Sequence, residues 1–189
     1  MAMLSQPSTG RPDSGAQAAF TLVELMVVVG IMGLLLAIAV PRYNQRISEY
    51  KLQAITMRLA NWLDEHRRLA MQQSGNCAIS INTSQAMFDA SVNETGISND
   101  ICGSTASQAR DPVLKLRDLE SGTNALTLTL LDGSTSPLYF SVRGLSPNGT
   151  QVQISLQGSS RCLWVTRPLG LIRMGLVKSG STSCTYSGM

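Results

Sequence analysis

The sequence predicts an α+β protein in which a long N-terminal helix packs on a C-terminal head of antiparallel strands. Three observations lead to this prediction. An apolar run of membrane length stands near the N-terminus, over Phe20–Val40. An amphipathic helical pattern follows over 42–76, and from Cys77 onward the chain consists of short β-like runs separated by turn residues.

Composition limits the classes of function. The 189 residues give room for one domain plus an attached element, and a net charge of +3 selects no partner by itself. The four cysteines form no CxxC pair and His66 is the single histidine, so we expect no metal site and no cofactor. Well-spaced cysteines beyond a membrane-length run indicate an oxidising compartment, such as a bacterial periplasm.

The apolar run Phe20–Val40 is long enough to span a bilayer. At about 1.5 Å per residue it covers roughly 30 Å, whereas an ordinary secretory signal has an apolar region of about 7–15 residues. The flank after the run carries Arg42, Arg46 and Lys51, which favours a cytoplasmic location for the rest of the chain. The cysteines favour the opposite topology.

Glu24 is the one carboxylate inside this run. A carboxylate in hydrocarbon costs roughly 2.5–3.5 kcal/mol, so it either needs a cationic partner or lies near the interface and reaches out of the membrane. It stands four residues, about one helical turn, after Phe20. Pro41 ends the run; because it lacks an amide donor, we expect a helix kink or a joint there.

After Pro41 an apolar stripe predicts one helix that packs on a sheet. His66 lies on or near the stripe, so we expect a packed or half-exposed side chain rather than a ligand. The helix should end at the glycine stop Ser74-Gly75-Asn76. The stripe consists of Ile47, Tyr50, Ala54, Ile55, Leu59, Trp62, His66 and Leu69.

The remainder, 77–189, is predicted to be a β-rich head. Asp132-Gly133 and Asn148-Gly149 are turn signals, and the polar stretch Asn93–Arg110 is expected to form a long loop. The predicted strands are Cys77–Asn82, Met87–Val92, Val113–Arg117, Ala125–Leu131, Leu138–Val142, Val152–Leu156, Cys162–Thr166 and Gly170–Val177.

The run FTLVELMVVV, which follows Ala19 directly, resembles the prepilin signature of type IV pilins and type II secretion pseudopilins. The resemblance implies a leader over 1–19, cleavage between Ala19 and Phe20 by a prepilin peptidase, and N-methylation of Phe20. The family usually has glycine before the cut, so we expect slower processing at Ala19. Residues 20–41 would form the membrane-spanning part of the helix.

The same resemblance implies a role for Glu24 and a topology. Cleavage before Phe20 would create a terminal ammonium, so Glu24 could pair with the chain's own terminus or with that of a neighbour in a helical bundle. In pilin-like proteins the carboxylate is taken to pair with the neighbouring subunit during assembly. The chain would be a single-pass protein of the bacterial inner membrane with a periplasmic head, and would then join a filament. Its partners would be the prepilin peptidase and other pilins or pseudopilins.

Residues 137–175 resemble the C-terminal half of the GspH/FimT group of minor pilins and pseudopilins. The group has a strand running into Arg-Gly and a later G-R-x-R-x-G element, here Gly170-Leu171-Ile172-Arg173-Met174-Gly175, with Leu171 in place of the first arginine. The resemblance does not cover residues 77–136. It implies a minor subunit at the filament tip or in the complex that starts assembly.

Four cysteines allow three disulfide pairings. Position along the chain favours Cys162 with Cys184, which would tie the tail to a strand, and Cys77 with Cys102, which would tie the long loop to the first strand. Each bond would contribute roughly 2–4 kcal/mol. Free or differently paired thiols are the alternative.

No acidic residue follows Asp132, whereas Arg143, Arg161, Arg167, Arg173 and Lys178 do. Arg161, Arg167, Arg173 and Lys178 are therefore candidates for contact with DNA phosphates, and some FimT-like minor pilins bind DNA through the G-R-x-R region. The alternative is a solvated basic face or contact with neighbouring pilins, which the loss of an arginine at Leu171 favours.

The sequence contains no GxSxG, P-loop or dinucleotide-binding pattern, so we expect no enzyme. Three functions stay open at this point. They are a structural minor pilin of a type IV pilus, the H-type pseudopilin of a type II protein secretion system, and a DNA-binding minor pilin for natural transformation.

Overall fold

The computed structural model describes residues 21–91, 100–102, 111–119, 126–131, 133–177 and 184–185. The chain divides into two compact units, Met1–Pro41 and Arg42–Met189. One helix, α1 (Leu22–Gln72), contributes to both units and runs through Pro41 without interruption. The expected kink at Pro41 stays a prediction.

The second unit, the head, contains two antiparallel sheets. The first has the order β3-β2-β1-β5, from β1 (Cys77–Asn82), β2 (Met87–Asp89), β3 (Val113–Lys115) and β5 (Leu138–Phe140). A 3-10 helix, η1 (Leu116–Leu119), follows β3. The second sheet has the order β4-β6-β7-β8-β9, from β4 (Thr127–Leu130), β6 (Thr150–Leu156), β7 (Ser159–Val165), β8 (Ile172–Val177) and β9 (Cys184–Thr185).

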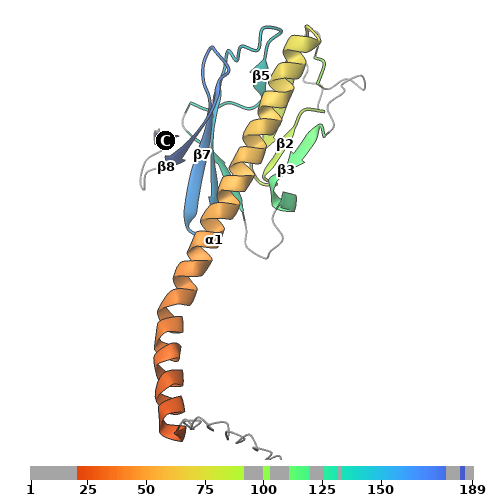
Figure 1. Ribbon diagram of the computed structural model, residues 1–189. Helices are drawn as coiled ribbons and strands as arrows, with labels where there is room; N and C mark the ends of the chain where they lie inside the picture. Colours follow the sequence, from red (N-terminus) through yellow and green to blue (C-terminus); the bar gives the residue numbers. More distant parts are fainter. Residues whose placement is uncertain are drawn as a thin grey trace, which may run out of the picture. The chain divides into compact units, whose positions relative to one another are not determined.

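Within the head, α1 crosses both sheets, with β7 and β8 to one side of it and β2 and β3 to the other (Figure 1). Its apolar stripe and the inner faces of the sheets form one hydrophobic core. Phe88 of β2 and Phe140 of β5 are completely buried there, and each such side chain stabilises the fold by roughly 1.5–3 kcal/mol. The predicted α+β class is confirmed: a long helix lies on antiparallel strands.

The buried stripe of α1 differs in detail from the predicted one. Tyr50 is 69% exposed and Ala54 is also exposed, whereas Leu52 and Leu63 are fully buried. A step of two residues turns a helix by about 200°, so Tyr50 and Leu52 must lie on opposite faces. The prediction of a stripe was right, but Tyr50 and Ala54 were placed on the wrong side.

The end of α1 also differs from the expected glycine stop. Gly75 donates its N–H to the Ala70 carbonyl at 3.1 Å, while Ser74 takes the left-handed conformation with φ of 53°. This is the Schellman pattern, with serine at the position that glycine usually holds.

Several strands are shorter than predicted, and β9 was not predicted because two residues give no period-2 signal. Residues 116–119 turn into η1 instead of extending β3. The predicted turns at Gly133 and Gly149 have φ of 75° and 56°. Most of the predicted loop Asn93–Arg110 lies outside the described residues.

Candidate functional site

The N-terminal part of α1 presents apolar side chains along its whole length. Its large apolar residues between Leu22 and Val40 are 45–72% exposed. By length and composition, α1 contains a segment that could cross a membrane. An apolar surface of this size is stable only in lipid or against other apolar helices.

Thr21 caps the start of this helix. Its Oγ1 accepts a hydrogen bond from the backbone N–H of Glu24 at 3.2 Å, which is the N-cap to N3 contact. Threonine followed three residues later by glutamate is the sequence pattern of a capping box, and sequence reasoning overlooked it. Glu24 also stands in the first turn, where the helix dipole favours a negative charge.

Ala19 and Phe20, the predicted cleavage and methylation positions, lie outside the described residues. The described chain begins one residue later, so Thr21 would be the second residue of a chain cut before Phe20. Because the helix is capped at Thr21, such a chain would be helical from its first turn onward.

Both disulfides are present in the pairing that position along the chain favoured. Cys77 and Cys102 are joined with a Cα–Cα separation of 5.1 Å, and Cys162 and Cys184 with one of 5.9 Å. The first bond ties the segment at residue 102 to β1. The second joins β7 to β9, the strands on either side of β8.

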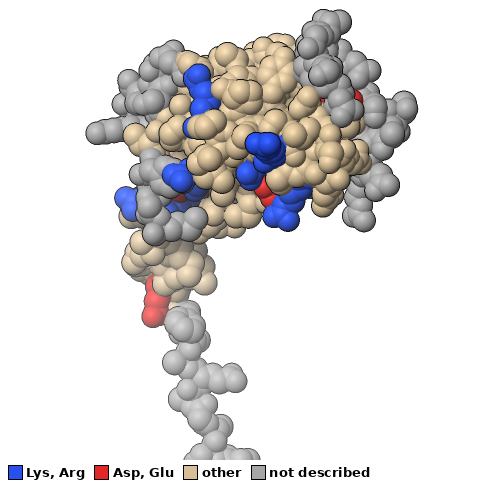
Figure 2. All heavy atoms as spheres, turned by 90° about the horizontal axis from the view of Figure 1, so that it is seen from above, with Lys and Arg blue, Asp and Glu red and all other residues tan. Residues whose placement is uncertain are grey.

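The basic residues of the C-terminal half do not form one continuous patch. Arg161 donates to the Gln53 side chain at 3.5 Å and Arg167 to the Gly133 carbonyl at 3.2 Å, so both have partners within the head. Arg143, Arg167 and Arg173 are exposed, and Lys178 lies outside the described residues. Figure 2 shows Lys and Arg side chains in separate groups with uncharged surface between them.

The structure explains why the Gly170–Gly175 element has glycine at both of its ends. Gly170 has φ of 64°, and a Cβ there would lie 2.5 Å from the Gly144 carbonyl oxygen. At Gly175 a Cβ would lie 2.6 Å from the Thr185 carbonyl oxygen. These glycines therefore allow close backbone contact, and this part of the element can be explained without a ligand.

Arg67 is an organising residue that sequence reasoning missed. Its Nε donates to the Gly144 carbonyl at 2.8 Å and its terminal nitrogen to the Leu169 carbonyl at 3.3 Å. It thereby joins α1 to the loops that follow β5 and β7. No sequence pattern indicates this role, because the arginine stands among other charged residues of the helix.

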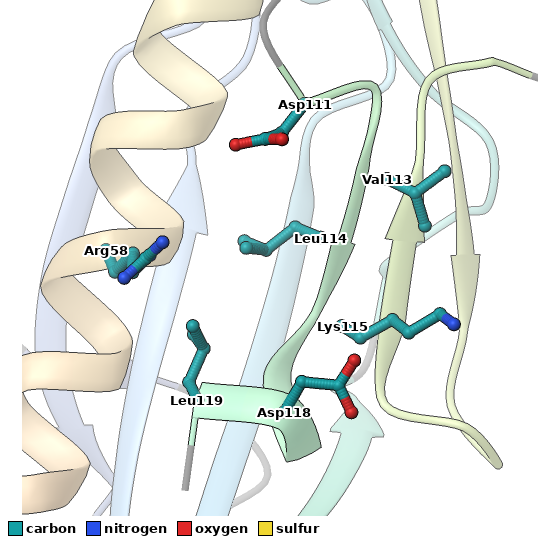
Figure 3. Close-up of a pocket in the computed structure, with 7 residues that line it drawn as sticks. All are labelled: Arg58, Asp111, Val113, Leu114, Lys115, Asp118 and Leu119. Carbon is teal, nitrogen blue, oxygen red and sulfur yellow. The ribbon is translucent and has the colours of Figure 1, made fainter.

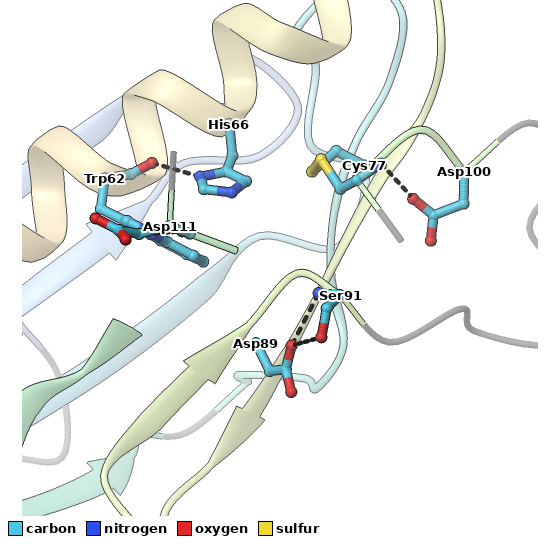
Figure 4. Close-up of a disulfide and its surroundings, with 8 residues drawn as sticks. Trp62, His66, Cys77, Asp89, Ser91, Asp100 and Asp111 are labelled. Carbon is cyan, nitrogen blue, oxygen red and sulfur yellow. Dashed lines mark hydrogen bonds between the residues drawn. A yellow bond between two sulfur atoms is a disulfide. The ribbon is translucent and has the colours of Figure 1, made fainter. Parts of the chain in front are cut away.

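His66 is a core residue, as the sequence predicted. It is 1% exposed, its ring centroid lies 3.9 Å from that of Trp62, and its Nδ1 bonds the Trp62 carbonyl at 2.9 Å (Figure 4). A carbonyl only accepts, so Nδ1 carries the proton. Burial lowers the pKa of His66, although the Trp62 carbonyl and the charge of Glu65 act in the opposite direction.

One recess in the head has a volume of about 300 Å³ and lies between α1 and the β3–η1 segment (Figure 3). Asp111, Leu114 and Leu119 point toward α1, from which Arg58 extends. The lining contains no histidine, cysteine or serine that could act as a nucleophile or its base. Within the described residues, no cluster of three or more metal-ligating side chains occurs.

Comparison with known proteins finds the Prokaryotic N-terminal methylation motif over residues 15–40. Two curated relatives from Moraxella bovis, the type IV major alpha-pilin and fimbrial protein Q, are each 47% identical over 45 residues. The match spans 24% of this chain and 28% and 29% of those proteins, so the chain covers less than a third of the length of the curated relatives it matches.

Two solved structures are also similar. The minor pilin FimU of Pseudomonas aeruginosa matches with a TM-score of 0.48 and 19% identity, over 70% of this chain and 92% of that one. The minor pseudopilin EpsH of the Vibrio cholerae type 2 secretion system matches with a TM-score of 0.48 and 13% identity, over 69% and 99%. Residues 15–40 thus match the N-terminal methylation motif, and the described part of that segment lies on the exposed apolar helix.

Proposed function

We propose that this chain is a minor pilin of the GspH/FimT type, incorporated in a type IV pilus at its tip or in the complex that starts assembly. The observation that carries the proposal is the methylation motif on a helix whose apolar side chains are all exposed around one carboxylate, Glu24. Such a helix can be held first by lipid and then by the helices of neighbouring subunits.

The proposed sequence of events follows from that helix. Prepilin peptidase cuts between Ala19 and Phe20, and the new terminus is methylated. The subunit waits in the inner membrane with its head in the periplasm, where both disulfides are stable. It then moves into a helical bundle in which Glu24 pairs with a terminal ammonium, a contact that fixes register more than it adds stability.

The H-type pseudopilin of a type II secretion system is the first alternative, because the same helix would serve it equally well. Deletion of the gene in cells that have both machines separates the two. Loss of surface pili with normal protein secretion supports the pilus proposal. Loss of secretion with normal pili supports the alternative.

A DNA-binding pilin is the second alternative. The structure describes three of its four candidate DNA-contacting residues, and two of these make hydrogen bonds within the head. Arg161 and Arg167 donate hydrogen bonds within the head, and Arg173 is the arginine of the Gly170–Gly175 element and is exposed. If the head binds DNA, Arg173→Ala should weaken binding and reduce the salt slope by about one. We expect instead only weak binding that is lost near physiological salt.

A further inference from the structure

Five large apolar side chains are exposed on segments that meet at one end of the head, and we call them the loop patch. Their exposed fractions run from 36% to 54%. Figure 1 shows the end of α1 and the loops after β5 and β7 at this end of the head. The loop patch consists of Met71 at the end of α1, Val142 and Leu145 after β5, and Leu169 and Leu171 between β7 and β8.

The loop patch is held by backbone contacts between its segments. The Ser146 N–H donates to the Pro168 carbonyl at 2.9 Å, which joins the two loops directly. Arg67 bonds a carbonyl in each loop, and a Cβ at Gly144 would lie 2.7 Å from the Met71 sulfur. The exposed leucines are therefore displayed on an ordered support.

Each loop also contains a backbone hydrogen bond between its own residues. In the first, the Ser141 N–H donates to the Leu145 carbonyl at 2.8 Å; in the second, the Gly170 N–H donates to the Thr166 carbonyl at 2.8 Å. A surface that is ordered before binding loses little conformational entropy when a partner covers it. Apolar side chains grouped on such a surface mark an interaction site more often than scattered ones do.

The charges around the loop patch select the kind of partner. Arg143 lies within the first loop, Arg167 within the second, and Arg173 two residues beyond Leu171, while no acidic residue follows Asp132 in the sequence. On α1, the Asp64 carboxylate lies 3.9 Å from Arg67 and 2.8 Å from Arg68, so these cations outnumber the carboxylate that the helix brings near the patch. The surroundings of the loop patch are therefore cationic. A second copy of this chain would bring the same cations to the contact, which like-charge repulsion disfavours.

We propose that the loop patch docks a different protein subunit, through an apolar surface of that subunit rimmed by carboxylates. This proposal rests on the proposed function, because it is the filament or its starting complex that would supply the neighbour. It adds which face of the head makes the contact and what chemistry the neighbour must present.

The test uses the full chain in the cells that make it, with a photo-crosslinking amino acid at position 169. A control chain carries the photo-crosslinking amino acid in place of Met57, which is 46% exposed on α1 and lies outside the loop patch. We expect an adduct with a different protein from position 169, in which the crosslinked peptide contains apolar and acidic residues. Arg143→Glu should reduce that adduct at least ~10-fold, while Lys115→Glu, the same charge change on β3, should not.

Four results would overturn the proposal. They are no adduct from position 169, an adduct of twice the subunit mass, an adduct with nucleic acid, or equal losses with Arg143→Glu and Lys115→Glu. The N-terminus of the same protein is determined in parallel. A chain that starts at methylated Phe20 and is recovered in filaments without an adduct refutes the docking surface alone. A chain that keeps residues 1–19 refutes the proposed function.

Discussion

Cys162 on β7 lies directly opposite Gly175 on β8, and a Cβ at position 175 would lie 3.4 Å from the Cys162 sulfur. That sulfur is bonded to Cys184 of β9, on the far side of β8. The strand between the two bonded cysteines thus has no side chain where the disulfide and the Thr185 carbonyl come closest. The disulfide and the glycine depend on each other.

Gly175→Ala should therefore destabilise the head by about 1–3 kcal/mol, the usual cost of an added methyl group in a packed site. The free energy of unfolding is measured by urea titration of the full chain in detergent. Gly33→Ala is the matched control, because its Cβ would meet nothing within 4 Å. Equal stability of the Gly175→Ala variant and the unchanged chain would show that β8 and β9 are further apart than described.

Arg67 and Arg68 are neighbours on α1 with unequal expected contributions to the stability of the head. Arg67→Met removes two hydrogen bonds to loop carbonyls, and each bond to a charged group is worth roughly 1.5–3 kcal/mol. Arg68→Met removes only a surface contact to Asp64 at 2.8 Å, worth about 0.3–0.5 kcal/mol. Thermal unfolding should show a larger loss of stability for Arg67→Met than for Arg68→Met. Similar losses of stability from both substitutions would contradict the role assigned to Arg67.

His66 should make the stability of the head fall in mild acid. Its pKa in the folded state is lowered from the ordinary 6.5, so the unfolded chain takes up its proton first as the pH falls. The stability contributed by neutral His66 is complete above about pH 6.5 and is lost below it, by up to about 1.4 kcal/mol per pH unit.

The variant His66→Gln measures this contribution. Urea unfolding between pH 7.5 and 5.5 should show a smaller loss of stability for the variant than for the unchanged chain. Glu65, whose charge acts on His66, and Asp111, whose carbonyl accepts a hydrogen bond from Trp62, are present in both chains, so their effects cancel in the comparison (Figure 4). Parallel curves would mean that His66 does not titrate in this range.

Glu24→Gln should be cleaved normally and stay in the membrane, yet be recovered from sheared filaments at a much lower level. The substitution keeps the shape of the side chain and removes the charge that pairs with a terminal ammonium. Thr21→Ser keeps the capping hydroxyl and is the control that should assemble normally. Normal incorporation of Glu24→Gln would contradict a role of the Glu24 charge in assembly.

The parts of the fold that follow a strong period were predictable. The apolar run, the helix over the head and most strands appear near their predicted positions because periodicity reports burial directly. The face of α1 that carries Tyr50 was misplaced because a tyrosine can be exposed at little cost. The contacts of Arg67, Gly144 and Gly170 could not be predicted, since they join three segments far apart in the chain.

The central claim is that this chain is processed and assembled as a pilin, and the mass and N-terminal sequence of the mature protein test it most directly. The protein is purified from cells with and without prepilin peptidase. We predict a peptidase-dependent chain that starts at N-methylated Phe20, with Thr21 as its second residue. A chain that keeps residues 1–19 in both strains, or one that is cut after Val40, would contradict the account.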